Sequence, residues 1–155
     1  MYKKFILFFI LFNFISHCGF TPIYSNKTNL NFSITSTEFE GEKIINIFLK
    51  NNLNQYKNNK HDRKFKIKIK TEYNKNILSK NKSAATTNFQ LTFNAEFQII
   101  SNDKIIKILN VSEKVIMDNI NDDFEEQKNE RIAKQNFASS ATNKLLTEIS
   151  ILNDN

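Results

Sequence analysis

The side chains best suited to catalysis are few in this sequence of 155 residues. Its two histidines, His17 and His61, lie far apart, and neither belongs to an HExxH metal-binding motif. A GxSxG nucleophile motif is absent, and two glycines cannot build a phosphate-cradling loop. His61 stands in a polar stretch, where a solvated imidazole is expected rather than a ligand or base. We therefore expect a protein that is not an enzyme and that uses no metal or dissociable cofactor.

An acidic cluster of four residues is the one group of carboxylates that could attract a divalent cation. Its members are Asp122, Asp123, Glu125 and Glu126. The same residues suit the first turn of a helix, where an aspartate caps the free backbone N–H groups and the positive helix end stabilises negative charge. We favour the helix start, with Asp122 or Asp123 as its N-cap.

Lysines alternate with apolar residues between positions 64 and 70. One hypothesis is that they contact the phosphates of an anionic glycolipid as point charges. The other is that they form a solvated strand face that opposes edge-to-edge aggregation. The four residues are Lys64, Lys66, Lys68 and Lys70.

The lone cysteine, Cys18, follows a segment typical of exported proteins. Lys3 and Lys4 precede an unbroken apolar run, Phe5–Phe12. This run is shorter than the ~20 residues of a transmembrane helix and has the character of a secretory signal, with a signal anchor as the alternative. Cys18 lies just beyond it, where bacterial lipoprotein precursors carry their lipidated cysteine. We predict a lipoprotein signal peptide at residues 1–17 and a covalent lipid on Cys18, although an incidental cysteine is the simpler alternative.

The neighbours of Cys18 resemble a lipoprotein processing site in most positions. Ile15 and Ser16 are similar to the start of a lipobox, whereas His17 departs from the small residue that the peptidase prefers. Gly19, in place of Asp, is similar to lipoproteins that are sorted to the outer membrane. Loss of residues 1–17 lowers the formal net charge from +6 to +4. Export to the periplasm argues against a nucleic-acid partner.

The middle of the chain alternates polar and apolar residues with the period of two that is typical of half-buried strands. The fourth of these stretches changes phase, which predicts a bulge near Leu109 or Asn110. Asn102-Asp103 suits a two-residue hairpin turn, and the polar residues 78–87 predict an exposed connection. The predicted strands cover residues 30–35, 64–73, 89–99 and 104–117.

Two segments instead show the three- and four-residue spacing of amphipathic helices. The first follows Gly41 and is followed in turn by a polar loop at residues 58–61. The second is the C-terminal segment, whose small residues from Ala138 to Ala141 would let it lie close to a sheet. Their apolar stripes are Ile44, Ile45, Phe48, Leu49, Leu53 and Tyr56, and Ile132, Ala133, Phe137, Ala141, Leu145, Ile149 and Leu152.

The predicted element order is β-α-β-β-β-α. It indicates an α+β fold, with a mostly antiparallel four-stranded sheet and two amphipathic helices packed on one face. Residues 18–155 form a single domain in this prediction. The other sheet face stays polar and is open to water or to a partner.

The segment from Cys18 to Tyr24, CGFTPIY, resembles the start of the mature LPS-assembly lipoproteins of the LptE family. That family typically opens with Cys-Gly-Phe, a proline two residues later and an aromatic soon after. The only proline, Pro22, stands at the matching place. The likeness continues through the element order to the C-terminal helix, but His17 and the scarcity of arginine depart from it.

The resemblance implies an outer-membrane lipoprotein that plugs an LptD-like β-barrel, helps that barrel to fold and assists lipopolysaccharide delivery. Lys66, Lys68 and Lys82 are the candidate lipopolysaccharide contacts, chosen by charge and expected exposure. Two alternatives stay open. One is a periplasmic lipoprotein that carries a lipid or serves a transport system, which predicts a pocket between sheet and helices. The other is a structural envelope lipoprotein that binds a protein through its sheet edge.

Overall fold

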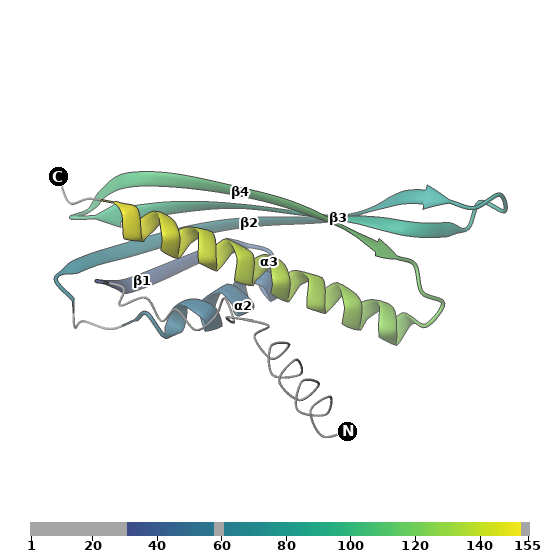
Figure 1. The fold of residues 1–155 in the computed structure, drawn as a ribbon, viewed down its shortest axis with the longest axis horizontal. Coiled ribbons are helices and arrows are strands. Elements are labelled where there is room, and N and C mark those ends of the chain that lie inside the picture. The colour runs from purple at the N-terminus through teal and green to yellow at the C-terminus, as the bar shows by residue number, and fades with distance from the viewer. Residues whose placement is uncertain (1–30, 58–60, 153–155) are drawn as a thin grey trace, which may run out of the picture. The chain divides into compact units, whose positions relative to one another are not determined.

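The computed structural model describes residues 31–57 and 61–152. The predictions for the signal peptide, Cys18, residue 30 and most of the loop at 58–61 lie outside these residues. The described elements follow the predicted order β-α-β-β-β-α (Figure 1). They are β1 (Phe32–Gly41), α2 (Lys43–Asn54), β2 (Arg63–Lys80), β3 (Thr86–Ser101), β4 (Lys104–Asp118) and α3 (Asp123–Ile151).

The four strands form one sheet in the order β1-β2-β3-β4. The pairs β2–β3 and β3–β4 are antiparallel, as predicted for a mostly antiparallel sheet. The pair β1–β2 is parallel, because α2 carries the chain back to the end of the sheet where β1 began. The sheet is therefore mixed, and β1 and β4 are its edges.

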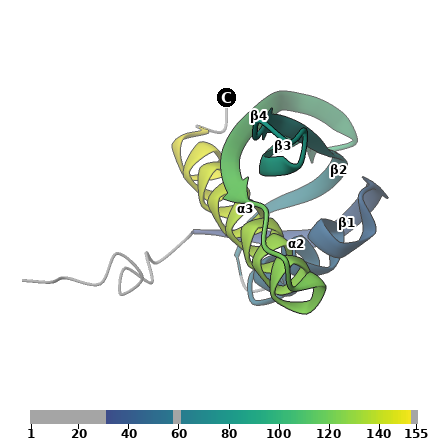
Figure 2. The ribbon, with the colours of Figure 1, turned by 90° about the vertical axis from the view of Figure 1, so that its right-hand side faces the viewer.

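Both helices lie against the same face of the sheet, which curves over them (Figures 1 and 2). Odd-numbered residues of β2 and β3 point into this core, including Phe65, Ile67, Phe93 and Phe97, which are at most 1% exposed. The rings of Phe93 and Phe137 stack with their centroids 5.5 Å apart. From α2 the core receives Ile45, Leu49 and Leu53, and from α3 it receives Phe137, Ala138, Ala141, Leu145 and Ile149.

Two tight turns position these elements as the sequence predicts. Asn102 and Asp103 have φ values of 49° and 60°, the left-handed conformations that a type I′ hairpin turn needs. Gly41 has φ of 98° and ends β1 directly before α2. A Cβ atom there would lie 1.8 Å from the carbonyl oxygen of Thr71, so only glycine allows this close approach.

The sequence predicts an exposed connection over residues 78–87, but the connection in the structure is shorter, so this prediction is wrong in its extent. β2 continues to Lys80 and β3 begins at Thr86, which leaves a five-residue turn. In that turn the Asn81 side chain accepts hydrogen bonds from the backbone N–H groups of Ser83 and Ala85. Polar strands form here because antiparallel backbone pairing continues beyond the core and needs no apolar side chains.

The bulge in β4 exists, but its predicted place near Leu109 or Asn110 is wrong. The register shifts where Ile99 pairs with Lys107 and Ile100 pairs with Ile105, so Ile106 is the extra residue. The shift turns Lys107 toward α3, where its ammonium lies 2.9 Å from Glu148. Position 107 therefore faces the helices but carries a charged residue, which the alternation of apolar residues does not predict.

Ile132 does not belong to the buried stripe of α3, contrary to prediction. It is 47% exposed, whereas Lys134 and Phe137 are buried. Residues two apart on a helix differ by about 200° in direction, so a helix that buries position 134 must expose position 132. Ile44, predicted to lie on the stripe of α2, is also partly exposed.

Candidate functional site

The face of the sheet away from the helices is uncovered, and its side chains are mainly polar. We call it the open sheet face. The paired residues Glu72, Asn94 and Ser112 form one row across β2, β3 and β4. The Ser112 hydroxyl donates to the Asn94 side-chain oxygen over 2.7 Å. Asn74, Thr92 and Lys114 form the next row, so this face offers hydrogen-bond donors and acceptors over several strands.

Lys66 and Lys68 lie on the open sheet face, and both already have carboxylate partners. Lys66 Nζ lies 2.7 Å from Asp103 Oδ1, and Lys68 Nζ lies 3.3 Å from Glu38 Oε2. The hydrogen bond between Lys66 and Asp103 raises the pKa of the lysine and lowers the pKa of the aspartate. Because β2 is an inner strand, its lysines cannot protect a sheet edge from aggregation.

Lys82 is remote from the other two candidate contacts. It lies in the turn between β2 and β3, at the far end of the long β2 strand from Lys66. Twelve residues of β2 at about 3.3 Å each separate Lys68 from Lys80, a distance of ~40 Å, and Lys82 lies in the turn beyond Lys80. The three lysines chosen from the sequence therefore do not converge on one ligand site.

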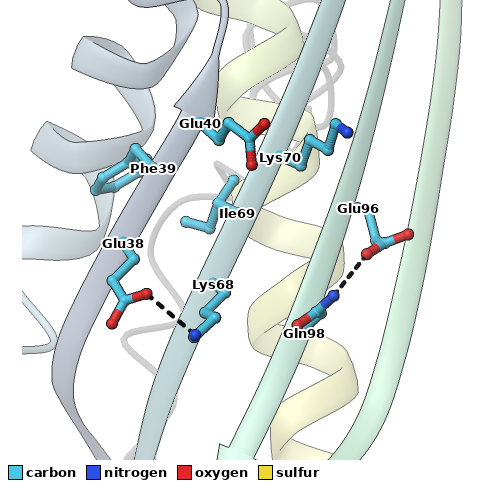
Figure 3. Close-up of a pocket in the computed structure, with 8 residues that line it drawn as sticks. All are labelled: Glu38, Phe39, Glu40, Lys68, Ile69, Lys70, Glu96 and Gln98. Atoms are coloured by element: carbon cyan, nitrogen blue, oxygen red, sulfur yellow. Dashed lines mark hydrogen bonds and ion pairs between the residues drawn. The ribbon is translucent and has the colours of Figure 1, made fainter.

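A shallow hollow of about 350 Å³ lies on the open sheet face where β1, β2 and β3 run side by side (Figure 3). Lys68 contacts Glu38 there, and the Gln98 amide donates to Glu96 Oε1 over 2.9 Å. A neighbouring hollow of about 400 Å³ surrounds Asn94 and Ser112. Charged and amide groups along these hollows suit hydrogen bonding to a polar surface and do not suit an acyl chain.

On the covered side, five charged residues with side chains 10–24% exposed form an ion cluster between α3, β2 and the start of α2, which we call the buried ion cluster. Lys75 Nζ lies 2.7 Å from Glu126 Oε1 and 3.0 Å from Glu130 Oε2. Lys134 Nζ lies 3.1 Å from Glu130 Oε1 and 3.3 Å from Glu42 Oε1. Each charge has an opposite partner, which offsets the cost of burial.

Aromatic rings complete this cluster. The Lys134 ammonium lies 4.2 Å from the centroid of the Tyr73 ring, and the Lys75 ammonium lies 4.4 Å from that of Phe89. Both distances fall within the range of cation–π attraction. The cluster therefore joins helix and strand through ion pairs and ring contacts together.

Burial and hydrogen bonds shift the pKa values of two charged residues in the cluster and of the neighbouring Tyr73. Burial alone would raise the pKa of Glu130, but hydrogen bonds from Lys75 and Lys134 outweigh it and bring the pKa below 4.5. Burial opposes the charge of Lys75 as well, yet hydrogen bonds to Glu126 and Glu130 raise its pKa. Burial, with the nearby charge of Glu130, raises the pKa of Tyr73. Glu130 and Lys75 therefore stay charged and Tyr73 stays neutral at physiological pH.

Glu42 links the cluster to the helix start. Its Oε2 accepts from the backbone N–H of Ile45 at 2.6 Å and caps α2, while Oε1 faces Lys134. Sequence reasoning missed this cluster, because glutamates early in α3 were assigned to its N-terminal turn. The available signal was the three- and four-residue spacing, because Lys134 and Phe137 lie on the buried stripe of α3 and Glu130 lies one helix turn before Lys134.

The other candidate residues have structural positions. Asp122 is the N-cap of α3, with its carboxylate accepting from the N–H groups of Phe124 and Glu125. Glu125 pairs with Lys128 at the surface. His61 precedes β2, and its backbone N–H donates to the Ser33 hydroxyl. Residues 31–57 and 61–152 hold no group of three or more side chains arranged to bind a metal.

Comparisons with known proteins find this fold among solved lipoproteins. Rare lipoprotein B from Shewanella oneidensis is 10% identical, with a TM-score of 0.55 over 74% of this chain and 93% of its own. An uncharacterized lipoprotein B from Nitrosomonas europaea is 13% identical, with a TM-score of 0.55 over 80% and 88%. A minor lipoprotein from Acinetobacter baumannii is 15% identical, with a TM-score of 0.51 over 74% and 94%.

These likenesses show a shared fold. The chain has the α+β architecture of these bacterial lipoproteins, across nearly their whole length. No protein-family model matches the sequence, and no curated protein matches it. Neither helix in the described part of the chain combines the length and the apolar character needed to span a bilayer.

Proposed function

We propose that this protein is an outer-membrane lipoprotein similar to LptE, anchored through a lipid on Cys18. In this proposal it forms a complex with an LptD-like β-barrel and serves lipopolysaccharide transport to, and assembly at, the cell surface. The observation that carries the proposal is the open sheet face, polar across three strands, on a fold shared with solved lipoproteins. Its role is binding, with no catalytic step.

The lumen of a wide outer-membrane barrel offers a polar wall, which is the surface that the open sheet face would need. Rows such as Asn74, Thr92 and Lys114 lose their hydrogen bonds to water when a partner covers them. Each lost hydrogen bond to water must be replaced by a hydrogen bond to the partner. A polar lumen can provide those bonds, whereas an apolar surface cannot.

The packing supports a plug over a lipid carrier. A carrier needs an apolar pocket between the sheet and the helices, but Phe97, Leu49 and Leu145 fill that space and are 0% exposed. Three hollows lined by described residues lie elsewhere. Two are on the open sheet face, and the third lies between α2 and the first half of α3.

Lipopolysaccharide contact stays a proposal for Lys66, Lys68 and Lys82. In it, Lys82 acts separately from the other two, because the length of β2 lies between them. Lys66 and Lys68 would have to exchange Asp103 and Glu38 for phosphate groups.

Co-purification from detergent-solubilised outer membranes tests the proposed complex. We expect a large barrel protein at one-to-one stoichiometry, and intact-mass analysis should show a lipid-modified N-terminus at Cys18. Ser112→Arg places a long charged side chain on the open sheet face and should reduce barrel recovery at least fivefold. Asn143→Arg, at an exposed position of α3, is the matched control and should leave recovery unchanged.

Three results would contradict the proposal. The first is a chain purified without any barrel. The second is equal recovery with both arginine variants. The third is an unmodified N-terminus at Met1, which removes the anchor. Recovery with a bound lipid but without a barrel would favour the lipid carrier instead.

A further inference from the structure

Four segments of the chain meet at the end of the domain that holds the β3–β4 turn (Figure 1). We call this end the turn end. Phe32, at the start of β1, pairs with Arg63 at the start of β2. The Arg63 guanidinium donates to the carbonyl oxygen of Leu152, just after α3. Lys66 holds Asp103 of the β3–β4 turn at 2.7 Å. The start of the described chain therefore lies beside the β3–β4 turn.

The predicted lipid anchor is close to this end along the chain. Residues 19–30 separate Cys18 from the first described residue, Asn31. The thirteen residue steps from Cys18 to Asn31 span at most about 47 Å when fully extended. A membrane that holds the lipid on Cys18 is therefore within reach of the turn end.

Apolar side chains gather on β4 at the turn end, unlike the polar rows farther along the strand. Ile105, Ile106 and Ile108 are 53%, 45% and 47% exposed, and we call these three residues the turn-end patch. The bulge at Ile106 breaks the alternation here, so that successive isoleucines reach solvent. Contiguous exposed apolar residues of this kind mark interaction surfaces.

Lysines surround the turn-end patch. Lys104 and Lys107 flank Ile105 and Ile106 in sequence, with Lys107 turned toward α3, and Lys64 lies on the open sheet face at the same end. Lys107 is balanced by Glu148. Lys64 and Lys104 form no ion pair with any residue in the described ranges, so their charges are available to an anionic partner. Isoleucine beside free lysine suits a bilayer interface, where acyl chains lie below anionic headgroups.

We propose that the turn-end patch docks on an anionic bilayer surface next to the lipid anchor. The contact would orient the domain, with the turn end on the membrane and the polar rows of the open sheet face free for the barrel. This inference rests on the proposed function only for the position of the membrane. The lipid supplies the anchoring, and the patch supplies the orientation.

Vesicle flotation of the unlipidated chain tests the docking. The protein is residues 18–155 with Cys18→Ser, so that binding cannot come from the lipid. Vesicles contain phosphatidylethanolamine and phosphatidylglycerol, with phosphatidylcholine vesicles for comparison. We expect binding to the anionic vesicles that weakens as salt rises, because salt screens the lysine contacts.

Substitutions in the turn-end patch test whether this patch is the surface that binds the vesicles. The double variant Ile105→Ser, Ile108→Ser should lower vesicle binding at least fivefold, and Lys104→Glu should lower it as well. Ile116→Ser is the matched control, since Ile116 is 63% exposed on the same strand and the same face but faces Gln90 at the far end. It should leave binding unchanged. Equal urea midpoints would show that all variants fold.

The inference is overturned if the unlipidated chain does not bind anionic vesicles, or if the patch and control variants bind equally. It is also overturned if the patch variants abolish a dimer and vesicle binding is absent, which would assign the patch to a second copy of the chain. None of these results bears on whether Cys18 carries a lipid, which intact-mass analysis decides. Failure of the docking can thus be told apart from failure of the proposed function.

Discussion

Gly41, the last residue of β1, lies against the backbone of Thr71. Its φ is 98°, and an added Cβ atom would lie 1.8 Å from Thr71 O, so there is no room for a side chain. The variant Gly41→Ala should lower the free energy of unfolding by more than about 2 kcal/mol, because strand and helix start must both shift. Urea denaturation followed by circular dichroism measures the change.

Ala84 provides the matched control for the glycine. It also has a positive φ, 62°, but lies exposed in the β2–β3 turn. The variant Ala84→Gly should leave stability equal or raise it by up to about 1 kcal/mol, because glycine accepts this conformation without strain. A Gly41→Ala variant as stable as the wild type would contradict the contact with Thr71.

Glu130 should make stability depend on acid pH. Its pKa is lower in the folded protein than the ordinary 4.5, so the unfolded chain binds more protons in acid. The stability it contributes is complete above about pH 4.5 and is lost as the pH falls through the lower, folded value. Glu130→Gln should cost about 1–3 kcal/mol at neutral pH and flatten the decline below about pH 5.

Denaturation series at several pH values check the role of Glu130. Glu125→Gln is the control, because Glu125 is more exposed and pairs only with Lys128 across one helix turn. It should decline with pH as the wild type does. Equal slopes for the wild type and Glu130→Gln would mean that the buried ion cluster does not hold Glu130 in its charged form.

At the scale of elements, the bulge in β4 makes one deletion tolerable. Removal of Ile106 leaves Ile105 opposite Ile100 and Lys107 opposite Ile99, a regular ladder. Removal of Ser112 instead forces the residues before it to shift by one, which moves Val111 from the core to the open sheet face. We expect a loss of about 1 kcal/mol or less for the first deletion and several times more for the second.

Thermal or urea unfolding of the two deletion variants measures this difference. A Ser112 deletion that is no less stable than the Ile106 deletion would contradict the assigned register. The comparison needs no knowledge of the partner, because it depends only on which residues face the core.

The elements themselves could be predicted because their signals are local. Alternation along residues 64–73 and 89–99 is typical of strands with one buried face, and Asn102-Asp103 suits the turn between β3 and β4. The far parts of β2 and β3 could not be predicted, because backbone pairing there depends on a neighbouring strand. The parallel pairing of β1 depends likewise on where α2 returns the chain.

The candidate site was less predictable than the fold. Exposure of Lys66 and Lys68 follows from alternation, but their partners Glu38 and Asp103 come from distant parts of the chain. The buried ion cluster was missed because charged residues are normally assigned to solvent, and only tertiary packing places Lys134 among three elements. The resemblance of residues 18–24 remains a prediction, since those residues lie outside the described part.

For the whole molecule, each face and end has a different proposed task. The helices and the buried ion cluster close one face, the open sheet face offers polar groups to a barrel, and the turn end carries apolar and basic residues. The lipid on Cys18 would keep these surfaces at the outer membrane. A periplasmic carrier would instead need an apolar pocket in the space that Phe97 and Leu145 fill.

Site-specific photo-crosslinking in cells tests the barrel complex most directly. A photoreactive residue at Ser112 probes the open sheet face, and one at Asn143 probes the exposed side of α3. The proposed complex predicts a strong crosslink from Ser112 to a large outer-membrane barrel protein and a weaker one, or none, from Asn143. A Ser112 probe that captures no barrel protein, while the chain is folded and present in the outer membrane, would contradict the account.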